Sequence, residues 1–215
     1  MQETFTRMYA SGGWTLVHDD KVSRSGLGSN LEQTAALRSE LPRLVADLGV
    51  RAVLDIPCGD FFWMSRTDLN IDSYVGADIV AELIDENIAR FARDDRRFRV
   101  LDLSQDELPR VDLVFSRDCL VHLSIADAQR CLENIKRSGS TYLATTTFTG
   151  RTQNENIVTG GWRPLNLCLE PFGLPAPLRL FDERCTEVYQ VVEDGREREE
   201  HFTDKSIGVW RIAEL

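Results

Sequence analysis

Hydrophobic and polar positions follow two different periods along this chain, and their order predicts alternating strands and helices. Short continuous apolar runs are typical of buried strands, whereas longer segments with an apolar residue every three or four positions are typical of amphipathic helices. The predicted strands are 51–56, 73–79, 97–103, 111–118 and 140–148. The predicted helices are 31–40, 42–49, 60–68, 81–93 and 124–138. Ser29 or Asn30 would cap the first helix and Ser124 the last.

This alternation predicts an α/β fold with a doubly wound, mostly parallel sheet, because parallel strands are joined by right-handed helical crossovers. The C-terminal part breaks the rhythm. Residues 150–184 are interrupted by Pro and Gly and are predicted to be a loop insertion. The runs 186–193 and 205–212, with the charged DGREREE between them, predict an antiparallel hairpin that closes the sheet. We expect one domain over residues 1–215, with 1–29 as an N-terminal arm or lid.

Charge and cysteine content narrow the class of protein. The chain has 35 acidic and 25 basic residues and a net charge of −10, which repels phosphate backbones and argues against a nucleic-acid partner. Its five cysteines include no C-x-x-C pair, which favours a reducing compartment. The N-terminus lacks the apolar core of a signal peptide, and no apolar run is long enough to span a bilayer. We expect a cytoplasmic protein, and a homodimer is compatible with the sequence.

The segment AVLDIPCGDFFWM, residues 52–64, follows the first predicted strand and is the first candidate binding site. Ligands of open parallel sheets bind at the carboxyl ends of the strands. A pyrophosphate of a nicotinamide cofactor needs a turn with three glycines there. This turn has Gly59 alone, preceded by Asp55 and Pro57 and followed by Asp60. The two carboxylates would repel a pyrophosphate and would suit a cationic ligand that carries an ammonium group.

The segments VLDIPCGDF, YVGADI, VLDLS and DLVFSRDCLVHL together resemble the class I S-adenosylmethionine-dependent methyltransferases, over roughly residues 50–148. The resemblance implies a Rossmann-like sheet of seven strands whose last strand is antiparallel, with S-adenosylmethionine as cofactor. In that family an acid after the second strand holds the ribose hydroxyls, and Asp78, 19 residues after Gly59, matches it. Other residues implied to contact the cofactor are Ile79, Asp102, Leu103 and Ser116, with Asp102 and Leu103 bordering the adenine.

The chain departs from the family at the turn itself. Pro57 and Phe61 stand where the first and third glycines are usual, so the ammonium and carboxylate end of the donor would be held differently. Arg24, in the segment SRSGLGSN, is a candidate partner for the donor's carboxylate if the arm folds over the site. The alternative is that Arg24 lies on a solvated loop.

The fourth predicted strand delivers Asp118 and His122 to the same edge of the sheet. Their spacing of four places them on one face of any helical turn. A histidine oriented by a carboxylate is a candidate general base for a hydroxyl acceptor. Asp118 and His122 could instead help to hold a divalent cation such as Mg²⁺, and Asp118 is the candidate metal ligand. His122 capping the next helix is the structural alternative.

Aromatic and hydrogen-bonding residues point to the acceptor. The loop insertion carries Trp162, Arg163 and Asn166, and the arm carries Trp14, a mixture that suits sugar rings and their hydroxyls. Packing of the loop onto the domain is the alternative. The segments SGGWTLVHDD and GGWRPLN also resemble small methyltransferases associated with bacterial polysaccharides, including those that 1-O-methylate methylmannose polysaccharide precursors, which implies a mannoside acceptor. The turn R-D-C-L after the fourth strand differs from the N-P-P-Y-like turn of enzymes that methylate base amines.

The sequence therefore predicts methyl transfer to a saccharide hydroxyl. Three alternatives stay open at this point. They are a methyltransferase for small phenols or amines, a nicotinamide-dependent oxidoreductase, and a non-catalytic module that binds the donor.

Overall fold

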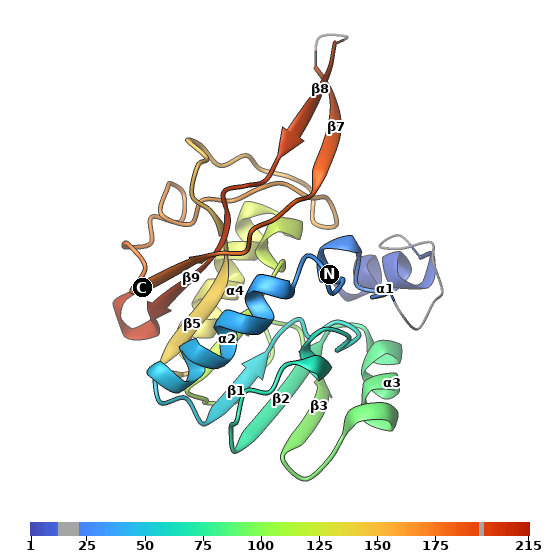
Figure 1. Ribbon diagram of the computed structural model, residues 1–215, viewed down its shortest axis with the longest axis vertical. Coiled ribbons are helices and arrows are strands. Elements are labelled where there is room, and N and C mark those ends of the chain that lie inside the picture. Colours follow the sequence, from blue (N-terminus) through green and yellow to red (C-terminus); the bar gives the residue numbers. More distant parts are fainter. Residues whose placement is uncertain (13–21, 194–195) are drawn as a thin grey trace.

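The computed structural model of this chain describes residues 1–12, 22–193 and 196–215. Its centre is a seven-stranded sheet with the order β3-β2-β1-β4-β5-β9-β6 (Figure 1). The strands are β1 Ala52–Asp55, β2 Ser73–Asp78, β3 Arg96–Val100, β4 Leu113–Ser116, β5 Tyr142–Phe148, β6 Arg179–Asp182 and β9 Lys205–Arg211. The first five pair in parallel, and β9 runs antiparallel between β5 and β6. The predicted fold class is confirmed.

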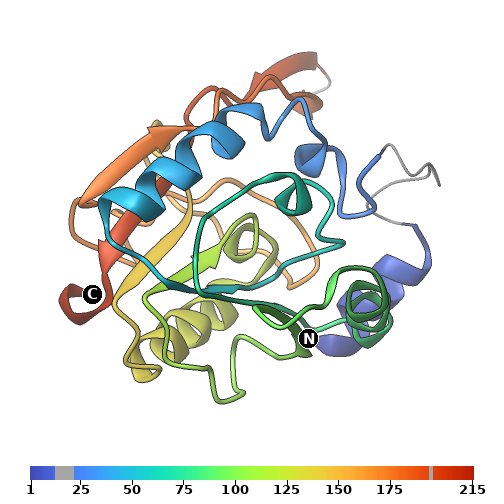
Figure 2. The same ribbon diagram turned by 60° about the horizontal axis from the view of Figure 1, so that its bottom comes forward.

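Helices cover both faces of this sheet. They are α1 Gln2–Ala10, α2 Ala35–Asp47, α3 Ala81–Phe91 and α4 Ile125–Arg137. Figure 2 shows α2 and α4 on opposite sides of the sheet. The alternation along β1 explains the two layers, since Val53 packs with residues of α2 and the adjacent Leu54 packs with residues of α4. None of the helices in the described part of the chain is long and apolar enough to cross a membrane.

Several of the predicted helices have other bounds in the structure, and one further prediction, the cap of α4, is met. α2 is one helix that continues through Pro42, and its Leu37, Leu41 and Leu44 bury one face. The predicted helix 60–68 is only a short 3-10 turn, Met64–Arg66. The Ser124 cap of α4 is confirmed, because its hydroxyl accepts from the Asp127 N–H at 3.1 Å.

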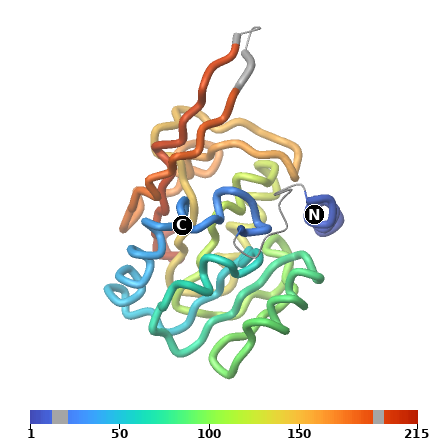
Figure 3. Tube along the Cα trace, turned by 45° about the vertical axis from the view of Figure 1, so that its right-hand side comes forward, coloured from blue at the N-terminus to red at the C-terminus, as the bar shows by residue number. Residues whose placement is uncertain are grey.

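The C-terminal pairing also differs from the prediction. β7 Val188–Glu193 pairs with β8 Arg196–His201 in a separate two-stranded sheet that projects from the main body (Figure 3). The run 205–212 is β9 and lies inside the main sheet, not in this hairpin. β8 has the sequence REREEH, which shows no apolar pattern because the hairpin is not covered by a layer of helices.

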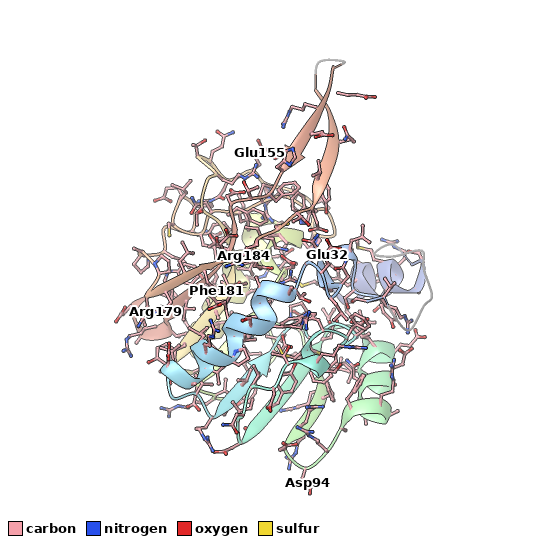
Figure 4. The ribbon with its side chains drawn as sticks, viewed as in Figure 1. Glu32, Asp94, Glu155, Arg179, Phe181 and Arg184 are labelled. Atoms are coloured by element: carbon pink, nitrogen blue, oxygen red, sulfur yellow. The ribbon has the colours of Figure 1, made fainter. Side chains whose placement is uncertain are left out.

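The sixth strand, β6, lies within the stretch predicted to be a loop. It is a short edge strand, and Figure 4 shows Arg179 and Phe181 at that edge of the molecule. Asp94, in the connection between α3 and β3, lies at the end of the sheet opposite the hairpin (Figure 4). The hairpin thus stands on the side of the carboxyl ends of the parallel strands, where ligands of such sheets bind.

Candidate active site

A cavity of about 370 Å³ lies at the carboxyl ends of β1, β2 and β4. It is within the size range of small-molecule sites, roughly 300–1,000 Å³. Many other parts of the chain also line it, among them α1, the segment 25–29, the turn after β1, the start of α3, the segment after β4, and the base of the β7–β8 hairpin. The turn after β1 and the start of α3 line one end, which we call the donor end. The hairpin base lines the other, which we call the acceptor end.

The turn after β1 requires glycine at position 59. Gly59 has a φ of 55°, and a Cβ at this position would lie 2.3 Å from the Ser25 Oγ. The next residue, Asp60, ties the N-terminal segment to the turn, since its carboxylate accepts from the Ser23 hydroxyl at 3.0 Å and from the Arg24 N–H at 2.7 Å. Asp60 therefore holds the segment that covers the cavity.

Asp55 and Asp78 both line the donor end and are both buried. The Asp78 carboxylate accepts from the Gly59 N–H at 3.2 Å and from the Val80 N–H at 3.1 Å, and burial raises its pKa to about 6. Asp55 accepts a hydrogen bond from the Tyr74 hydroxyl, and burial raises its pKa to about 7. Two acids that are costly to ionise thus meet at one end of the cavity.

Replacing Asp55 with Asn is expected to remove part of the pH dependence of folding. Folding raises the pKa of Asp55 from 3.8 to about 7, so the unfolding free energy falls as the pH rises from about 4 to about 7. Asn mimics the protonated acid, so the variant should gain about 4 kcal/mol relative to the wild type between pH 4 and pH 8. Urea unfolding at the two pH values measures this change.

Asp78 contributes to the pH dependence with the same sign in both proteins, so the difference between them reports Asp55 together with its repulsion by Asp78. The control is Asp72→Asn, an exposed carboxylate paired with Arg51. Its stability should follow the wild type closely across the range. Equal losses of stability in the wild type and in Asp55→Asn between pH 4 and pH 8 would contradict the role given to Asp55.

The other predicted cofactor residues divide into two groups. Pro57, Ile79 and Leu103 line the cavity. Asp102 and Ser116 lie behind the lining: the Asp102 carboxylate accepts from the Ser104 hydroxyl at 2.6 Å, and the Ser116 carbonyl accepts from the Thr145 hydroxyl at 2.6 Å. Asp102 therefore shapes the turn that presents Leu103.

Arg24 is not among the residues that line the cavity. Its guanidinium forms an ion pair with Glu86 on α3 at 2.6 Å and stacks over the ring of Tyr9, 4.6 Å from the centroid. Both partners come from helices that flank the cavity. The structure thus uses Arg24 to join α1, α3 and the segment after α1.

Asp118 is an ionised carboxylate between two cations at the acceptor end. Its Oδ2 lies 2.7 Å from the Lys205 Nζ and 3.1 Å from an Nη of Arg117. These cations hold the pKa of Asp118 well below its ordinary range. Its backbone is left-handed, with a φ of 51°, and its N–H donates to the Thr146 hydroxyl at 2.8 Å.

His122 closes a 3-10 turn, Leu120–His122, and also lines the cavity. Its Nδ1 lies 2.9 Å from the Gly161 carbonyl oxygen, so Nδ1 carries the proton and Nε2 carries the lone pair. Burial lowers the pKa of the imidazole from 6.5, which keeps it neutral near pH 7. The nearby Asp118 carboxylate acts in the opposite direction and would stabilise an imidazolium.

Three buried charged residues around Asp118 were missed by the sequence analysis. The Arg117 Nε and Nη2 donate to the Glu183 carboxylate at 2.9 and 2.7 Å, and the Lys205 Nζ lies 3.8 Å from the same carboxylate. The available signal was a lysine at the start of the apolar run of β9 and an arginine directly after β4. Neither position reveals its partner, since Glu183 follows an edge strand that was predicted to be a loop.

An aromatic wall covers the acceptor end and comprises Phe148, Trp162, Tyr189 and Phe202. The ring centroids of Trp162 and Phe202 are 4.9 Å apart, and those of Trp162 and Tyr189 are 5.3 Å apart. All four line the cavity. Of these, the sequence predicted only Trp162. Trp14, the other predicted tryptophan, lies outside the described residues.

Arg163 and Asn166 do not line the cavity. Arg163 donates to the carbonyls of Leu120 and Leu123 at 2.8 and 2.6 Å, and thereby holds the turn that carries His122. Asn166 donates to the Arg151 carbonyl at 3.0 Å, and this bond joins two parts of the loop insertion. Their polar groups are therefore used inside the protein.

The residues around Asp118 do not fit a Mg²⁺ site. Lys205 and Arg117 already neutralise its carboxylate and would repel a divalent cation. Among the residues that the structure describes, no three His, Cys, Asp or Glu side chains are grouped so that they could hold a metal ion.

Comparison with solved structures identifies the fold. The N-methyltransferase NodS from Bradyrhizobium japonicum WM9, in complex with S-adenosylhomocysteine, matches with a TM-score of 0.60 and 14% identity over 95% of this chain and 97% of that chain. Human N-acetylserotonin methyltransferase, in complex with S-adenosylmethionine, matches with a TM-score of 0.60 and 13% identity over 97% of this chain and 59% of that chain. This chain has the class I methyltransferase fold.

A third solved structure, the methyltransferase domain of bacterial CtHen1, matches with a TM-score of 0.57 and 12% identity over 85% of this chain and 100% of that chain. The chain spans less than two thirds of several of the solved proteins that it matches, the human enzyme among them. No protein-family model matches the sequence, and no curated protein matches it. At these identities the likeness concerns the methyltransferase fold, and none of it bears on polysaccharides.

Proposed function

We propose that this protein is an S-adenosylmethionine-dependent O-methyltransferase that acts on a saccharide hydroxyl. One observation carries the proposal: one cavity is lined by the acids Asp55 and Asp78 and by His122, whose ring proton is on Nδ1. The likeness of the fold to solved methyltransferases supports this class of enzyme.

The donor end fits S-adenosylmethionine. A Cβ at position 59 would collide with the Ser25 side chain, so the glycine lets the segment 25–29 pack directly on the turn at this end of the cavity. Asp78 has carboxylate oxygens for the ribose hydroxyls, and Asp55 supplies an acid for the cationic end of the donor. Leu101, Leu103 and Leu83 offer an apolar surface for the adenine ring.

His122 is the proposed general base. When bound, S-adenosylmethionine supplies a methyl group whose bond to sulfur breaks as its bond to the acceptor oxygen forms, the sulfur keeping the electron pair. The Nε2 lone pair of His122 takes the proton of the acceptor hydroxyl. Gly161 keeps the other ring proton in place, and the carboxylate of Asp118 stabilises the imidazolium that results. Lys205 and Arg117 in turn hold Asp118.

The chemistry of the acceptor end supports a neutral, polyhydroxylated acceptor. Its aromatic wall offers faces for the C–H groups of a sugar ring. Its charged groups are two cations, Arg117 and Lys205, and three carboxylates, Asp118, Glu183 and Glu187. This balance disfavours an acceptor that carries a phosphate or a carboxylate.

The runner-up acceptor is a small amine on the same scaffold. The carboxylates of Asp118 and Glu187 both lie at the acceptor end, and both could hold an ammonium group. A neutral His122 is needed less for an amine than for a hydroxyl, since an amine with a free lone pair does not have to lose a proton before it attacks.

The test is incubation with S-adenosylmethionine labelled in its methyl group and a panel of neutral oligosaccharides, mannosides among them, amines, phenols and acidic sugars. We expect the label in the neutral sugar fraction, with and without a chelator of divalent cations. Label found only in amines or phenols would overturn the saccharide assignment. Failure of the protein to bind S-adenosylhomocysteine in calorimetry would overturn the methyltransferase proposal itself.

A cytoplasmic location and a homodimer stay predictions.

A further inference from the structure

Tyr9, on α1, has a buried polar group that the proposed function has not used. The side chain lines the cavity and is only 9% exposed. Its hydroxyl oxygen is buried and has no hydrogen-bond partner among the described residues. A buried hydroxyl without a partner destabilises a protein, so such a group in a native fold calls for a missing partner.

Several contacts hold the Tyr9 ring at the donor end. It packs against Val80 and Leu83, two and five residues after the predicted ribose acid Asp78. Arg24 stacks over the ring, 4.6 Å from its centroid, and is itself anchored by Glu86 on α3. The ring therefore sits beside the start of α3. Figure 1 shows α1 and α3 at the same side of the molecule.

The Tyr9 hydroxyl is a hydrogen-bond donor at every physiological pH. Burial raises the pKa of Tyr9 to about 12, so the proton stays on the oxygen. The groups that face it are Arg24, Glu86, Glu82 and Asp60. None of these bonds to the hydroxyl, and the side chain of Asp60 is engaged by the segment 23–25.

We propose that Tyr9 is a donor-binding residue, whose hydroxyl donates a hydrogen bond to an oxygen of S-adenosylmethionine on its ribose or its amino-acid part. The inference rests on the proposed function and extends it to α1, which the sequence analysis placed in an N-terminal arm or lid without giving Tyr9 a role. The helix then closes the donor end by contact with the ligand. Arg24 acts through Tyr9 as a positioning residue.

The test compares wild type with Tyr9→Phe, which keeps the ring and its packing and removes only the oxygen. We expect the Kd for S-adenosylhomocysteine to rise about 5- to 10-fold, as for a lost neutral hydrogen bond. The melting temperature of the unliganded variant should stay unchanged or rise, because no bond is lost without ligand. The stabilisation by S-adenosylhomocysteine should shrink. The matched control is Tyr142→Phe on β5, a tyrosine that does not line the cavity.

Adenosine, which lacks the amino-acid part, distinguishes the two ends of the donor. A weaker affinity of Tyr9→Phe for both ligands would place the bond on the ribose, and a weaker affinity for S-adenosylhomocysteine alone would place it on the amino-acid part. Equal affinities of Tyr9→Phe and wild type for S-adenosylhomocysteine would overturn this inference and leave the proposed function intact. Absence of binding by the wild type would overturn both.

Discussion

Replacing His122 with Ala is expected to lower the methyl-transfer rate by about 10²–10⁴-fold while S-adenosylhomocysteine affinity stays within about twofold of the wild type. The imidazole is the only proposed base for the acceptor proton, and the change leaves Asp55 and Asp78, which line the same cavity, in place. Turnover with the acceptor found in the labelled-donor screen, together with calorimetry, measures the two quantities separately.

The pH profile gives a second readout of the same residue. Because burial lowers the pKa of His122 from 6.5, the base is already neutral at pH 7. At saturating S-adenosylmethionine, where titration of Asp55 and Asp78 no longer limits donor binding, turnover should fall as acid protonates the ring. The control is His201→Ala on β8, whose side chain is 55% exposed and lies beside Glu199. Near-normal turnover in His122→Ala would exclude it as the base and favour an amine acceptor.

Replacing Asp78 with Asn is expected to weaken the binding of S-adenosylhomocysteine by about 10- to 100-fold, because the charged acceptor for the ribose hydroxyls is lost. The carboxylate also accepts from the N–H groups of Gly59 and Val80, and an amide can satisfy only one of them with its single oxygen. Burial raises the pKa of Asp78 to about 6, so wild-type affinity should itself fall as the pH drops through about 6. Calorimetry at pH 5.5 and pH 8 checks both statements.

Asp112 offers a matched control for this variant. Its carboxylate accepts from the N–H groups of Arg51 and Ala52 at 2.8 and 2.9 Å, at the opposite end of β1. Asp112→Asn makes the same acid-to-amide change at another backbone anchor and, since one oxygen accepts both bonds there, it should leave donor affinity unchanged. If Asp78→Asn and Asp112→Asn bind S-adenosylhomocysteine equally well, Asp78 does not hold the donor.

The donor end was accessible to sequence reasoning because its signals are local. Asp55 and Gly59 stand within one turn after an apolar strand, and Asp78 ends the next strand. In a parallel sheet the carboxyl ends of neighbouring strands meet at one edge, so adjacency follows from strand order alone. The alternation of strands and helices likewise predicted the five parallel strands.

The acceptor end was not accessible in this way, since its residues come from segments far apart in the chain. Tyr189 lies in β7 and Phe202 directly follows β8, in a hairpin whose strand pairing the sequence predicted differently. Lys205 donates to Asp118, which is 87 residues away in the sequence. Arg24, Arg163 and Asn166 were predicted to bind ligands because of their hydrogen-bonding groups. In the structure these groups bond to Glu86 and to backbone carbonyls instead. Residue type indicates what a side chain can bind, and only its neighbours decide what it does bind.

The amino-acid sequence by itself determined the five parallel strands, the turn at Gly59 and the acids Asp55 and Asp78 at the strand ends, because hydrophobic periodicity and strand-end chemistry act over a few residues. Tertiary structure alone decided that β9 enters the main sheet, that the hairpin supplies the aromatic wall, and that α1 brings the Tyr9 hydroxyl to the donor end. The physical reason is that burial and charge pairing depend on contacts between distant segments, which no local pattern encodes.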